Sequence, residues 1–350
     1  MTENTADQRV WASPTVVGLR HAVRATVPAD TTRVVVGCSG GPDSLVLTAI
    51  AAWVGERHGF AVHAVTVDHQ LQNNSGEVAA TAARNAIALG ATSAEVVTVE
   101  VSGEGGVEAA ARHARRAALL ETSQGAPILL GHTATDQAET VLLRLLRGAG
   151  THSLSAMAAV DPPWYRPFLT VPRADIVTAV QELLIPLGIT PWSDPHNSDA
   201  DFARVRMRDH LQRLTEDFGP GLVAGLVRTA DLARADDLAL ESFAEAFLAE
   251  HPSVTGPSAT GPSAAIQSDF QLSIADLVHL PAAIRTRVIR RIYGIVAGVD
   301  RESSPLTFQH VQSIDSLVTE WHGQGEIAMP LGVSAVREYD RLRIYRTATT

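Results

Sequence analysis

The sequence predicts an α/β fold: a doubly wound, Rossmann-like parallel sheet followed by a second, smaller and mostly helical domain. Two observations carry this prediction. Short β-branched runs alternate with longer helical stretches through the first half of the chain, a pattern typical of a parallel sheet covered by helices on both faces. In the second half, alanine and leucine recur at helical spacing.

The elements of the first half follow one another as strand, helix, strand, helix. The predicted strands cover residues 33–37 (RVVVG), 60–67 (FAVHAVTV), 95–101 (EVVTVEV) and 127–131 (PILLG). The helices that follow them cover, in the same order, residues 44–56, 75–89, 107–121 and 137–147. Because ligands of such sheets bind at the carboxyl ends of the strands, we expect the site at the turns after them.

Beyond residue 150 the pattern changes. Residues 151–201 are Pro-rich and irregular and indicate connecting structure, whereas residues 211–250 and 277–294 are predicted helices. Residues 326–346 predict two short strands, and the repeated unit TGPSA at 255–264 predicts a flexible insertion. We expect three parts, namely an N-terminal extension with a first helix (1–30), a nucleotide-binding domain (31–205), and a substrate domain (206–350) with the insertion at 253–266.

Composition excludes several kinds of chemistry. All 28 Lys or Arg residues are arginine, which excludes a Schiff-base lysine, a covalent lysyl-nucleotide, a Walker-type loop and protein-kinase chemistry. The single cysteine, Cys38, excludes an internal disulfide and any multi-cysteine zinc or iron–sulfur site. Since the net charge is −10, binding to a nucleic acid must depend on local arginine clusters.

The start of the chain bears on its location. Residues 1–9 are polar and lack the apolar core of a signal peptide, and no apolar run is long enough to span a bilayer. We therefore expect a cytoplasmic protein with no membrane partner. The oligomeric state stays open, with a homodimer as one option.

The strongest motif lies between the first predicted strand and helix and reads Ser39-Gly40-Gly41-Pro42-Asp43-Ser44. Two glycines let the backbone approach an anion, and the helix N-terminus adds its positive dipole end. Ser39 and Ser44 can donate hydroxyls, so the motif predicts a pyrophosphate cradle. Asp43 would repel phosphate unless a cation lies between them, which indicates Mg²⁺. A plain glycine turn with a capped helix is the alternative.

Four further segments join this loop in resembling one family. They are Val67–Ser75 (VDHQLQNNS), Glu108–Arg115 (EAAARHAR), Gly131–Gly150 (GHTATDQAETVLLRLLRGAG) and Trp192–Asn197 (WSDPHN). The loop alone resembles that of the N-type ATP pyrophosphatases, which cleave ATP between the α and β phosphates. Together the segments resemble the tRNA(Ile)-lysidine synthase family over residues 33–213, and the tail fits it more loosely.

The resemblance implies an adenine nucleotide alpha hydrolase-like fold and an ATP-dependent ligase. In this family the C2 oxygen of the wobble cytidine of an isoleucine tRNA with a CAU anticodon attacks the α-phosphorus of ATP, and pyrophosphate leaves. The amine of L-lysine then attacks C2, AMP leaves, and lysidine results. Charge builds on phosphoryl oxygens in the first step, so fixed cations and N–H donors should do most of the catalysis.

The same resemblance implies roles for individual residues. The implied catalytic residues are Asp43, Arg112, Arg115, His132 and Asp136, with Asp43 and Asp136 as Mg²⁺ ligands. The implied nucleotide contacts are the six loop residues together with Val67, His69, Gly131 and Glu139. A guanidinium forks onto phosphate, which suits Arg112 or Arg115 to the adenylated intermediate. His69 and His132 are candidate acceptors of the lysine ammonium proton.

Each of these assignments has a structural alternative. The arginines of residues 112–116 could form a solvated helix face, Asp136 and Glu139 could be the usual acids of a first helical turn, and an isolated histidine is more often structural. The implied tRNA contacts are Arg144, Arg147, Arg204, Arg206 and Arg208. For a further string, tRNA contact and a surface salt-bridge face both stay open; it comprises Arg285, Arg287, Arg290 and Arg291.

Four residues depart from the family pattern: Gln70, Gln72, Thr135 and Val205. Gln70 and Gln72 stand in place of Gly and Arg, and Val205 in place of Asn. Thr135 leaves Asp136 without an acidic neighbour. Other enzyme interpretations are a tRNA thiolase of the same superfamily, which needs cysteines that this chain lacks, and a relative of GMP or NAD synthetase. A non-catalytic ATP-sensing module is the alternative from a different class.

Overall fold

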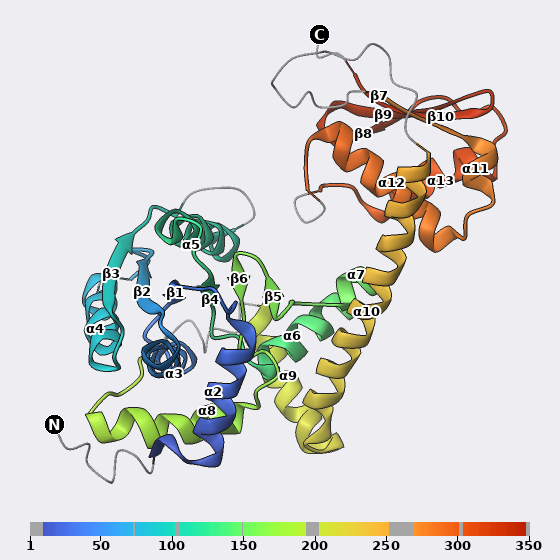
Figure 1. Cartoon of the computed structure of the whole chain (residues 1–350). Coiled ribbons are helices and arrows are strands. Elements are labelled where there is room, and N and C mark those ends of the chain that lie inside the picture. The colour runs from blue at the N-terminus through green and yellow to red at the C-terminus, as the bar shows by residue number, and fades with distance from the viewer. Residues whose placement is uncertain are drawn as a thin grey trace. The chain divides into compact units, whose positions relative to one another are not determined.

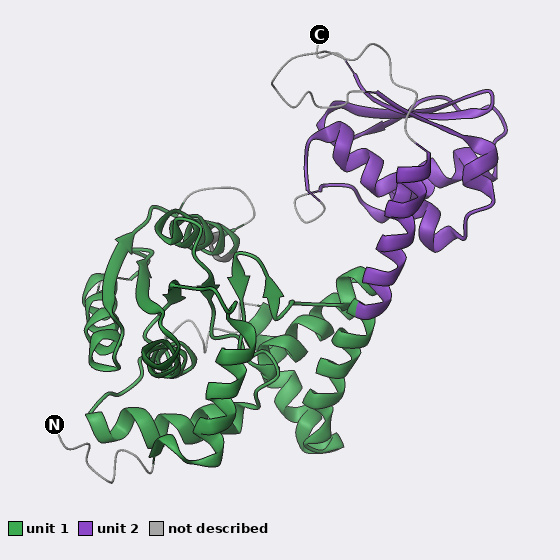
Figure 2. Ribbon diagram, in the orientation of Figure 1, with its two compact units in different colours: residues 1–234 green, residues 235–350 purple. Residues whose placement is uncertain are grey.

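The computed structural model describes residues 10–72, 74–101, 106–148, 150–193, 203–251, 269–300 and 304–347 (Figure 1). The chain divides into two compact units, residues 1–234 and residues 235–350 (Figure 2). The boundary predicted between residues 205 and 206 falls inside a helix, and the predicted insertion at 253–266 lies outside the described residues. Within the described ranges, every helix is too short or too polar to cross a membrane.

The first unit is built on a six-stranded sheet in the order β3-β2-β1-β4-β6-β5. The strands are β1 (Arg33–Gly37), β2 (Ala61–Asp68), β3 (Ser93–Thr98), β4 (Ile128–Leu129), β5 (Val160–Asp161) and β6 (Trp164–Tyr165). Neighbouring strands pair in parallel except β5, which is antiparallel to β6. The four predicted strands and the predicted fold class are therefore confirmed.

Helices cover both faces of this sheet because successive residues of a strand point to opposite sides. In β1, Val34 and Val36 join the core with α3, α2 and α8, whereas Val35 packs with Leu119 of α5 on the other face (Figure 1). The helices of this unit are α2 (Pro14–Thr26), α3 (Pro42–His58), α4 (Ser75–Ala88), α5 (Val107–Ser123), α6 (Ala134–Leu145), α7 (Thr151–Leu154), α8 (Arg173–Ala179) and α9 (Ala203–Phe218). The sheet is thus doubly covered, as predicted.

The segment 151–201 is more than connecting structure, which corrects the prediction for it. It supplies β5 and β6 to the sheet edge, and α8 with a following π-helical turn (Val180–Leu184) to one face. Strands of two residues carry no period-2 pattern, and the prolines between them favour a turn. No periodic signal therefore marks these strands in the sequence.

The second unit combines helices with a four-stranded antiparallel sheet in the order β7-β10-β9-β8. Its elements are the end of α10 (Gly221–Glu250), β7 (Asp269–Ser273), α11 (Ile274–Val278), α12 (Ala282–Ala297), α13 (Phe308–Thr319), β8 (Ile327–Met329), β9 (Val333–Glu338) and β10 (Arg341–Arg346). Tyr293 of α12 is fully buried in a core shared with Ala335 and Ile344 of the sheet. The sequence indicated two of these strands, and the predicted helix 211–250 is divided at Gly219, where φ is +91°.

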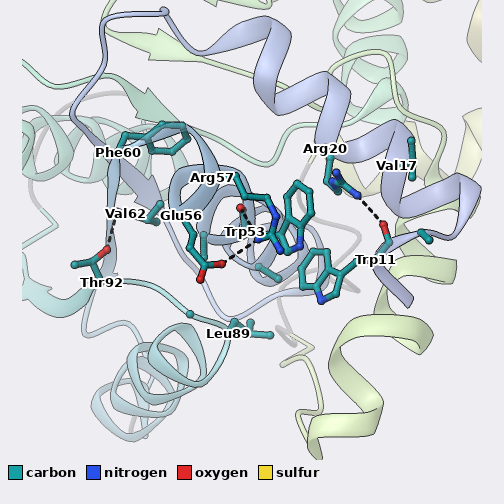
Figure 3. Close-up of a pocket in the computed structure, with 14 residues that line it drawn as sticks. Trp11, Val17, Arg20, Trp53, Glu56, Arg57, Phe60, Val62, Leu89 and Thr92 are labelled. Carbon is teal, nitrogen blue, oxygen red and sulfur yellow. Dashed lines mark hydrogen bonds and ion pairs between the residues drawn. The ribbon is translucent and has the colours of Figure 1, made fainter. Parts of the chain in front are cut away.

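A cavity of about 870 Å³ lies beside α2 and α3, and Phe60, Val62 and Thr92 near the starts of β2 and β3 also line it (Figure 3). Its main feature is Trp53, whose ring lies 3.2 Å from the guanidinium carbon of Arg20 and 3.7 Å from that of Arg57. Trp11 stacks on Trp53 with ring centroids 5.5 Å apart. Arg20 also donates to the Trp11 carbonyl, and Arg57 pairs with Glu56. These contacts tie α2 to α3 and give the lining residues a structural role.

Candidate active site

The glycine loop connects β1 to the first turn of α3. Gly40 has a φ of +80°, and a Cβ there would lie 3.0 Å from the Cβ of Ala82. Both the backbone conformation and the close packing favour glycine at this position. Gly41 is the N-cap of α3, and Pro42 follows in the first turn, where its missing N–H has no helical partner to lose. The loop therefore presents a helix N-terminus at the carboxyl end of the sheet.

Hydrogen bonds hold the loop in this shape. The Ser39 amide donates to Ser44 Oγ at 3.1 Å, and the Ser44 hydroxyl donates to the Gly41 carbonyl at 3.0 Å. From much later in the chain, the Trp192 amide donates to the Gly40 carbonyl at 2.9 Å. The loop is therefore ordered both by hydrogen bonds within it and by one from Trp192, and such order before binding favours an anion site.

Gly131 brings the end of β4 against the first turn of α3. A Cβ on Gly131 would lie 3.0 Å from both the carbonyl carbon and oxygen of Asp43, and 3.2 Å from the Ser44 amide nitrogen. A side chain would push the two segments apart. The structure thus places Gly131 at the loop through packing of backbone against backbone.

A pocket of about 350 Å³ opens between this loop and the carboxyl ends of β2 and β4. The residues assigned to the site from the sequence that line it are Ser39, Gly41, Asp43, Ser44, Val67, His69, Arg115, Gly131, His132 and Asp136. Trp192 and residues 70–72 line it as well, although the sequence suggested no role for Trp192. The volume is within the range of small-molecule sites.

Gln70, in the turn after β2, has a backbone conformation that favours glycine. Its φ is +55°, in the left-handed region, and its amide donates to Asp68 Oδ1 at 2.9 Å. A residue with a Cβ is strained there by about 1 kcal/mol, which glycine avoids. The turn after β2 therefore adopts a left-handed conformation at a residue that is not glycine.

Asp43 forms an ion pair with Arg173, the first residue of α8. Burial raises the pKa of the Asp43 carboxyl, the charge of Arg173 lowers it, and the charge of Asp136 raises it again. Asp43 and Asp136 therefore belong to one electrostatic cluster beside the loop. Sequence reasoning missed Arg173, because it lies in the segment that carried no periodic signal.

Asp136 has a capping role as well as a place in the pocket. Its Oδ2 accepts the Thr133 amide at 2.7 Å and the Thr133 hydroxyl at 2.9 Å, which caps the N-terminus of α6. Both bonds use one carboxylate oxygen. The first-turn alternative for this residue is therefore realised together with its position beside the loop.

Glu139 is buried and bonded to a residue expected at the tRNA surface. Arg208 Nε donates to Glu139 Oε1 at 2.8 Å, and the Glu139 side chain is only 4% exposed. Burial raises the pKa of Glu139, although the bond from Arg208 opposes that shift. Glu139 is not among the residues that line the pocket. Its carboxylate is instead bonded to the guanidinium of Arg208.

Arg112 and Arg115 lie in a cluster of arginines that includes Arg116, Arg166 and Arg204. Burial, followed by the charges of these neighbours with Arg204 first, lowers the pKa of Arg112 to about 10. Burial and then Arg204 and Arg116 lower the pKa of Arg115. An anion placed among these cations would relieve their repulsion, so the cluster has the charge of a phosphate site.

His69 and His132 are the two histidines of the pocket. Burial first and the charge of Arg115 second lower the pKa of both, that of His132 well below its ordinary value. The Nδ1 atom of each is buried without a hydrogen-bond partner among the described residues. Both shifts favour the neutral form of the imidazole ring.

The arginine string of α9 divides according to helical geometry. Arg204 and Arg208 are four residues apart and share a face, on which Arg204 joins the arginine cluster and Arg208 reaches Glu139. Arg206, between them, is exposed. On α6 and just beyond it, Arg144 donates to the Ser153 carbonyl at 2.7 Å, and Arg147 is exposed.

In the second unit, the string on α12 is bonded to acidic residues. Arg285 donates to both carboxylate oxygens of Asp315, at 2.6 and 3.0 Å. Arg287 pairs with Asp237 and Glu241 of α10, and Arg291 with Glu241. Of the two alternatives left open for this string, the contacts favour the salt-bridge one.

Comparison with known proteins agrees with this geometry. Residues 17–215 match the family model of the PP-loop domain, and residues 272–343 match that of the TilS substrate binding domain. A solved U34-tRNA thiolase, NcsA from Methanococcus maripaludis with its [4Fe-4S] cluster, has a TM-score of 0.53 and 18% identity. It covers 63% of this chain and 80% of its own, and this likeness concerns the fold alone.

Curated relatives match nearly the whole chain. The tRNA(Ile)-lysidine synthase of Thermobifida fusca is 45% identical over 93% of this chain and 96% of its own length. The synthase of Rhodococcus erythropolis is 42% identical over 93% and 92%, and that of Mycolicibacterium paratuberculosis 45% identical over 84% and 83%. The glycine loop, the arginine cluster and these matches lead to one conclusion: the chain belongs to the tRNA(Ile)-lysidine synthase family.

Proposed function

We propose that the protein ligates L-lysine to C2 of the wobble cytidine of an isoleucine tRNA with a CAU anticodon, with ATP converted to AMP and pyrophosphate. The observation that carries the proposal is a pocket lined by both the phosphate loop and Arg115, whose arginine neighbours make it a site for anions. The curated relatives supply the substrate class.

In the adenylation step, the C2 oxygen attacks the α-phosphorus and the bond from that phosphorus to the bridging oxygen breaks. The loop residues Ser39–Ser44 bind the pyrophosphate portion through backbone N–H groups and the N-terminus of α3. Arg112 and Arg115 stabilise the phosphoryl oxygens that gain charge. The loop is already ordered, so little reorganisation opposes this step.

In the second step, the lysine amine attacks C2 of the adenylated base and AMP leaves. The ammonium must first lose a proton, and His132 and His69, which line the pocket, are the candidate acceptors. The carboxylates of Asp136 and Glu139 offer an electrostatic site for an ammonium group. Glu139 can take it only when Arg208 moves aside, because the two are hydrogen-bonded.

The donor set beside the loop fits Mg²⁺. Asp43 and Asp136 are two neighbouring carboxylates, and the described residues contain no group of three or more metal-ligating side chains. Magnesium characteristically takes one or two carboxylates and completes its shell with substrate phosphates and water. When bound, it would neutralise the repulsion between Asp43 and the polyphosphate.

A thiolase activity is not supported, although a thiolase shares the fold. Cys38 is the only cysteine of the chain, whereas a cysteine-bound iron–sulfur cluster needs several. Burial raises the pKa of the Cys38 thiol, which disfavours the reactive thiolate.

Incubation of the protein with ATP, labelled lysine and total tRNA tests the proposal. Label in tRNA that depends on both ATP and lysine, with one AMP formed per lysine, is the expected result. ATP binding without AMP formation would instead identify a sensor module.

The variant Asp43→Asn sharpens the test. We expect it to abolish AMP release, because the loop loses the charge that organises the cation beside the phosphates. Asp30→Asn, an exposed aspartate before β1, is the matched control and should keep full turnover. Equal thermal unfolding of the two variants would show that the fold survives, and unchanged turnover of Asp43→Asn would remove its role.

A further inference from the structure

The ion pair between Arg173 and Asp43 joins two distant parts of the first unit. Asp43 is in the first turn of α3, and Arg173 is the first residue of α8. The Asp43 side chain is 31% exposed and that of Arg173 47% exposed. Since both side chains are partly exposed, ligands from solution can reach each of them and replace its partner.

Each member of this pair can instead bind a ligand of opposite charge: Asp43 a divalent cation, and Arg173 a polyphosphate. A divalent cation at Asp43 would repel the guanidinium and take over its role as counter-ion. A polyphosphate in the loop would attract the same guanidinium, whose planar fork matches two phosphate oxygens. When the cation and the polyphosphate bind together, Arg173 therefore loses Asp43 as its partner and gains the phosphate oxygens.

We propose that Arg173 is a further phosphate-binding residue of this site, paired with Asp43 while the loop is empty and with the polyphosphate when a metal ion occupies Asp43. The inference rests on the proposed cleavage of ATP. When the α-phosphorus bond to the bridging oxygen breaks, the electron pair stays on that oxygen, and the departing pyrophosphate carries the additional negative charge. Arg173 stabilises that charge.

The proposal predicts effects of opposite sign from one substitution. In Arg173→Gln without nucleotide, Mn²⁺, used as a paramagnetic probe of the metal site, should bind about threefold more tightly, because no guanidinium competes for Asp43. Magnesium pyrophosphate should bind the same variant about tenfold more weakly, because a charge-assisted contact is lost. Electron paramagnetic resonance measures the first and titration calorimetry the second.

Two further variants complete the experiment. Arg173→Lys keeps the charge without the fork, so Mn²⁺ affinity should stay near that of the unmodified protein while pyrophosphate affinity falls to an intermediate value. Arg84→Gln, which removes an exposed arginine from α4, is the matched control and should alter neither.

The proposal is supported only if Arg173→Gln binds Mn²⁺ more tightly and magnesium pyrophosphate more weakly than the unmodified protein. Weaker binding of both ligands by Arg173→Gln would mean that the pair merely supports the shape of the loop, and unchanged pyrophosphate binding would mean that Arg173 never reaches the phosphates. Either result overturns the inference. Because neither titration contains tRNA or lysine, the outcome is independent of the lysine-labelling assay that tests the proposed function.

Discussion

Arginines gather in both units of the molecule, and their surroundings differ. In the first unit, Arg112 and Arg115 have other arginines as neighbours, and no ion pair within the described residues joins either of them to an acid. In the second unit, Arg285, Arg287 and Arg291 each pair with an acidic residue. The same residue type therefore has a different role in each place.

These surroundings distinguish a cation that binds a ligand from one that supports the fold. A cation whose neighbours are also cations is costly to the fold and is justified by an anion that comes from outside. A cation bonded to acids of its own unit already has a counter-ion and stabilises packing instead. In the sequence both groups look like basic strings, and only the spatial arrangement distinguishes them.

Removal of the cations that lack an acidic partner should have the largest effect. The double variant Arg112→Gln/Arg115→Gln should lower the rate of AMP formation about 10²–10³-fold, because charge on the phosphoryl oxygens loses its fixed partners. Its unfolding free energy should stay the same or rise, since repulsion is relieved. A rate within a few-fold of the unmodified protein, measured by AMP release, would contradict the assignment.

Removal of a paired cation should have the converse effect. Arg285→Ala leaves Asp315 without a counter-ion in a site where both side chains are about one-tenth exposed, so unfolding free energy should fall by about 3 kcal/mol. The double variant Arg285→Met/Asp315→Leu removes both charges and should recover most of that loss. Urea unfolding measures both, and a silent Arg285→Ala would show that the pair contributes nothing.

Salt dependence of tRNA binding separates cations that contact tRNA phosphates from cations that do not. Arg206→Gln should flatten the slope of log K against log salt by about 1, the value of one lost phosphate contact. Arg287→Gln, whose guanidinium is engaged by Asp237 and Glu241, should leave the slope unchanged. Equal slopes for both variants would clear Arg206 of a role in tRNA binding.

The smallest expected effect concerns the histidine beside the arginine cluster. Because the folded-state pKa of His132 is lowered, the unfolded chain takes up a proton below about pH 6.5 that the folded protein does not. Between pH 6.5 and 5.5 the unmodified protein should thus lose up to about 1 kcal/mol of unfolding free energy relative to His132→Gln.

The raised pKa values of Asp43 and Glu139 act in the opposite direction at acid pH, and the comparison of the two proteins cancels them. Urea unfolding at pH 7.5, 6.5 and 5.5 measures the difference. Parallel curves across this range would mean that the histidine is not held neutral by its surroundings.

The first half of the fold could be predicted because each of its signals is local. The run RVVVG forms β1, and the glycines after it have the backbone conformation and close approach that small residues allow. The strands β5 and β6 could not be predicted, since two residues form no pattern and their pairing depends on β4. In the second unit, β7 pairs with β10 across a long stretch of sequence, which also escapes local reasoning.

For the site, motif positions predicted which residues gather, and the pocket brings most of them together. What the motifs could not supply is the pairing among side chains. Arg173 meets Asp43 only through the packing of α8 on α3, and Arg208 meets Glu139 only because α9 is helical there. The order of the arginines in the sequence does not show that residues two positions apart on a helix point in different directions.

The amide of Trp192 donates a hydrogen bond to the carbonyl of Gly40, which lies about 150 residues earlier in the chain, so the order of synthesis affects when the loop is complete. A nascent polypeptide that has left the ribosome as far as residue 150 already contains the glycine turn, the first four parallel strands and their intervening helices. It still lacks Trp192 and therefore the hydrogen bond from Trp192 to Gly40. The ability to bind a nucleotide should therefore appear late in translation, after β5 and β6 have been synthesised and Trp192 has bonded to Gly40.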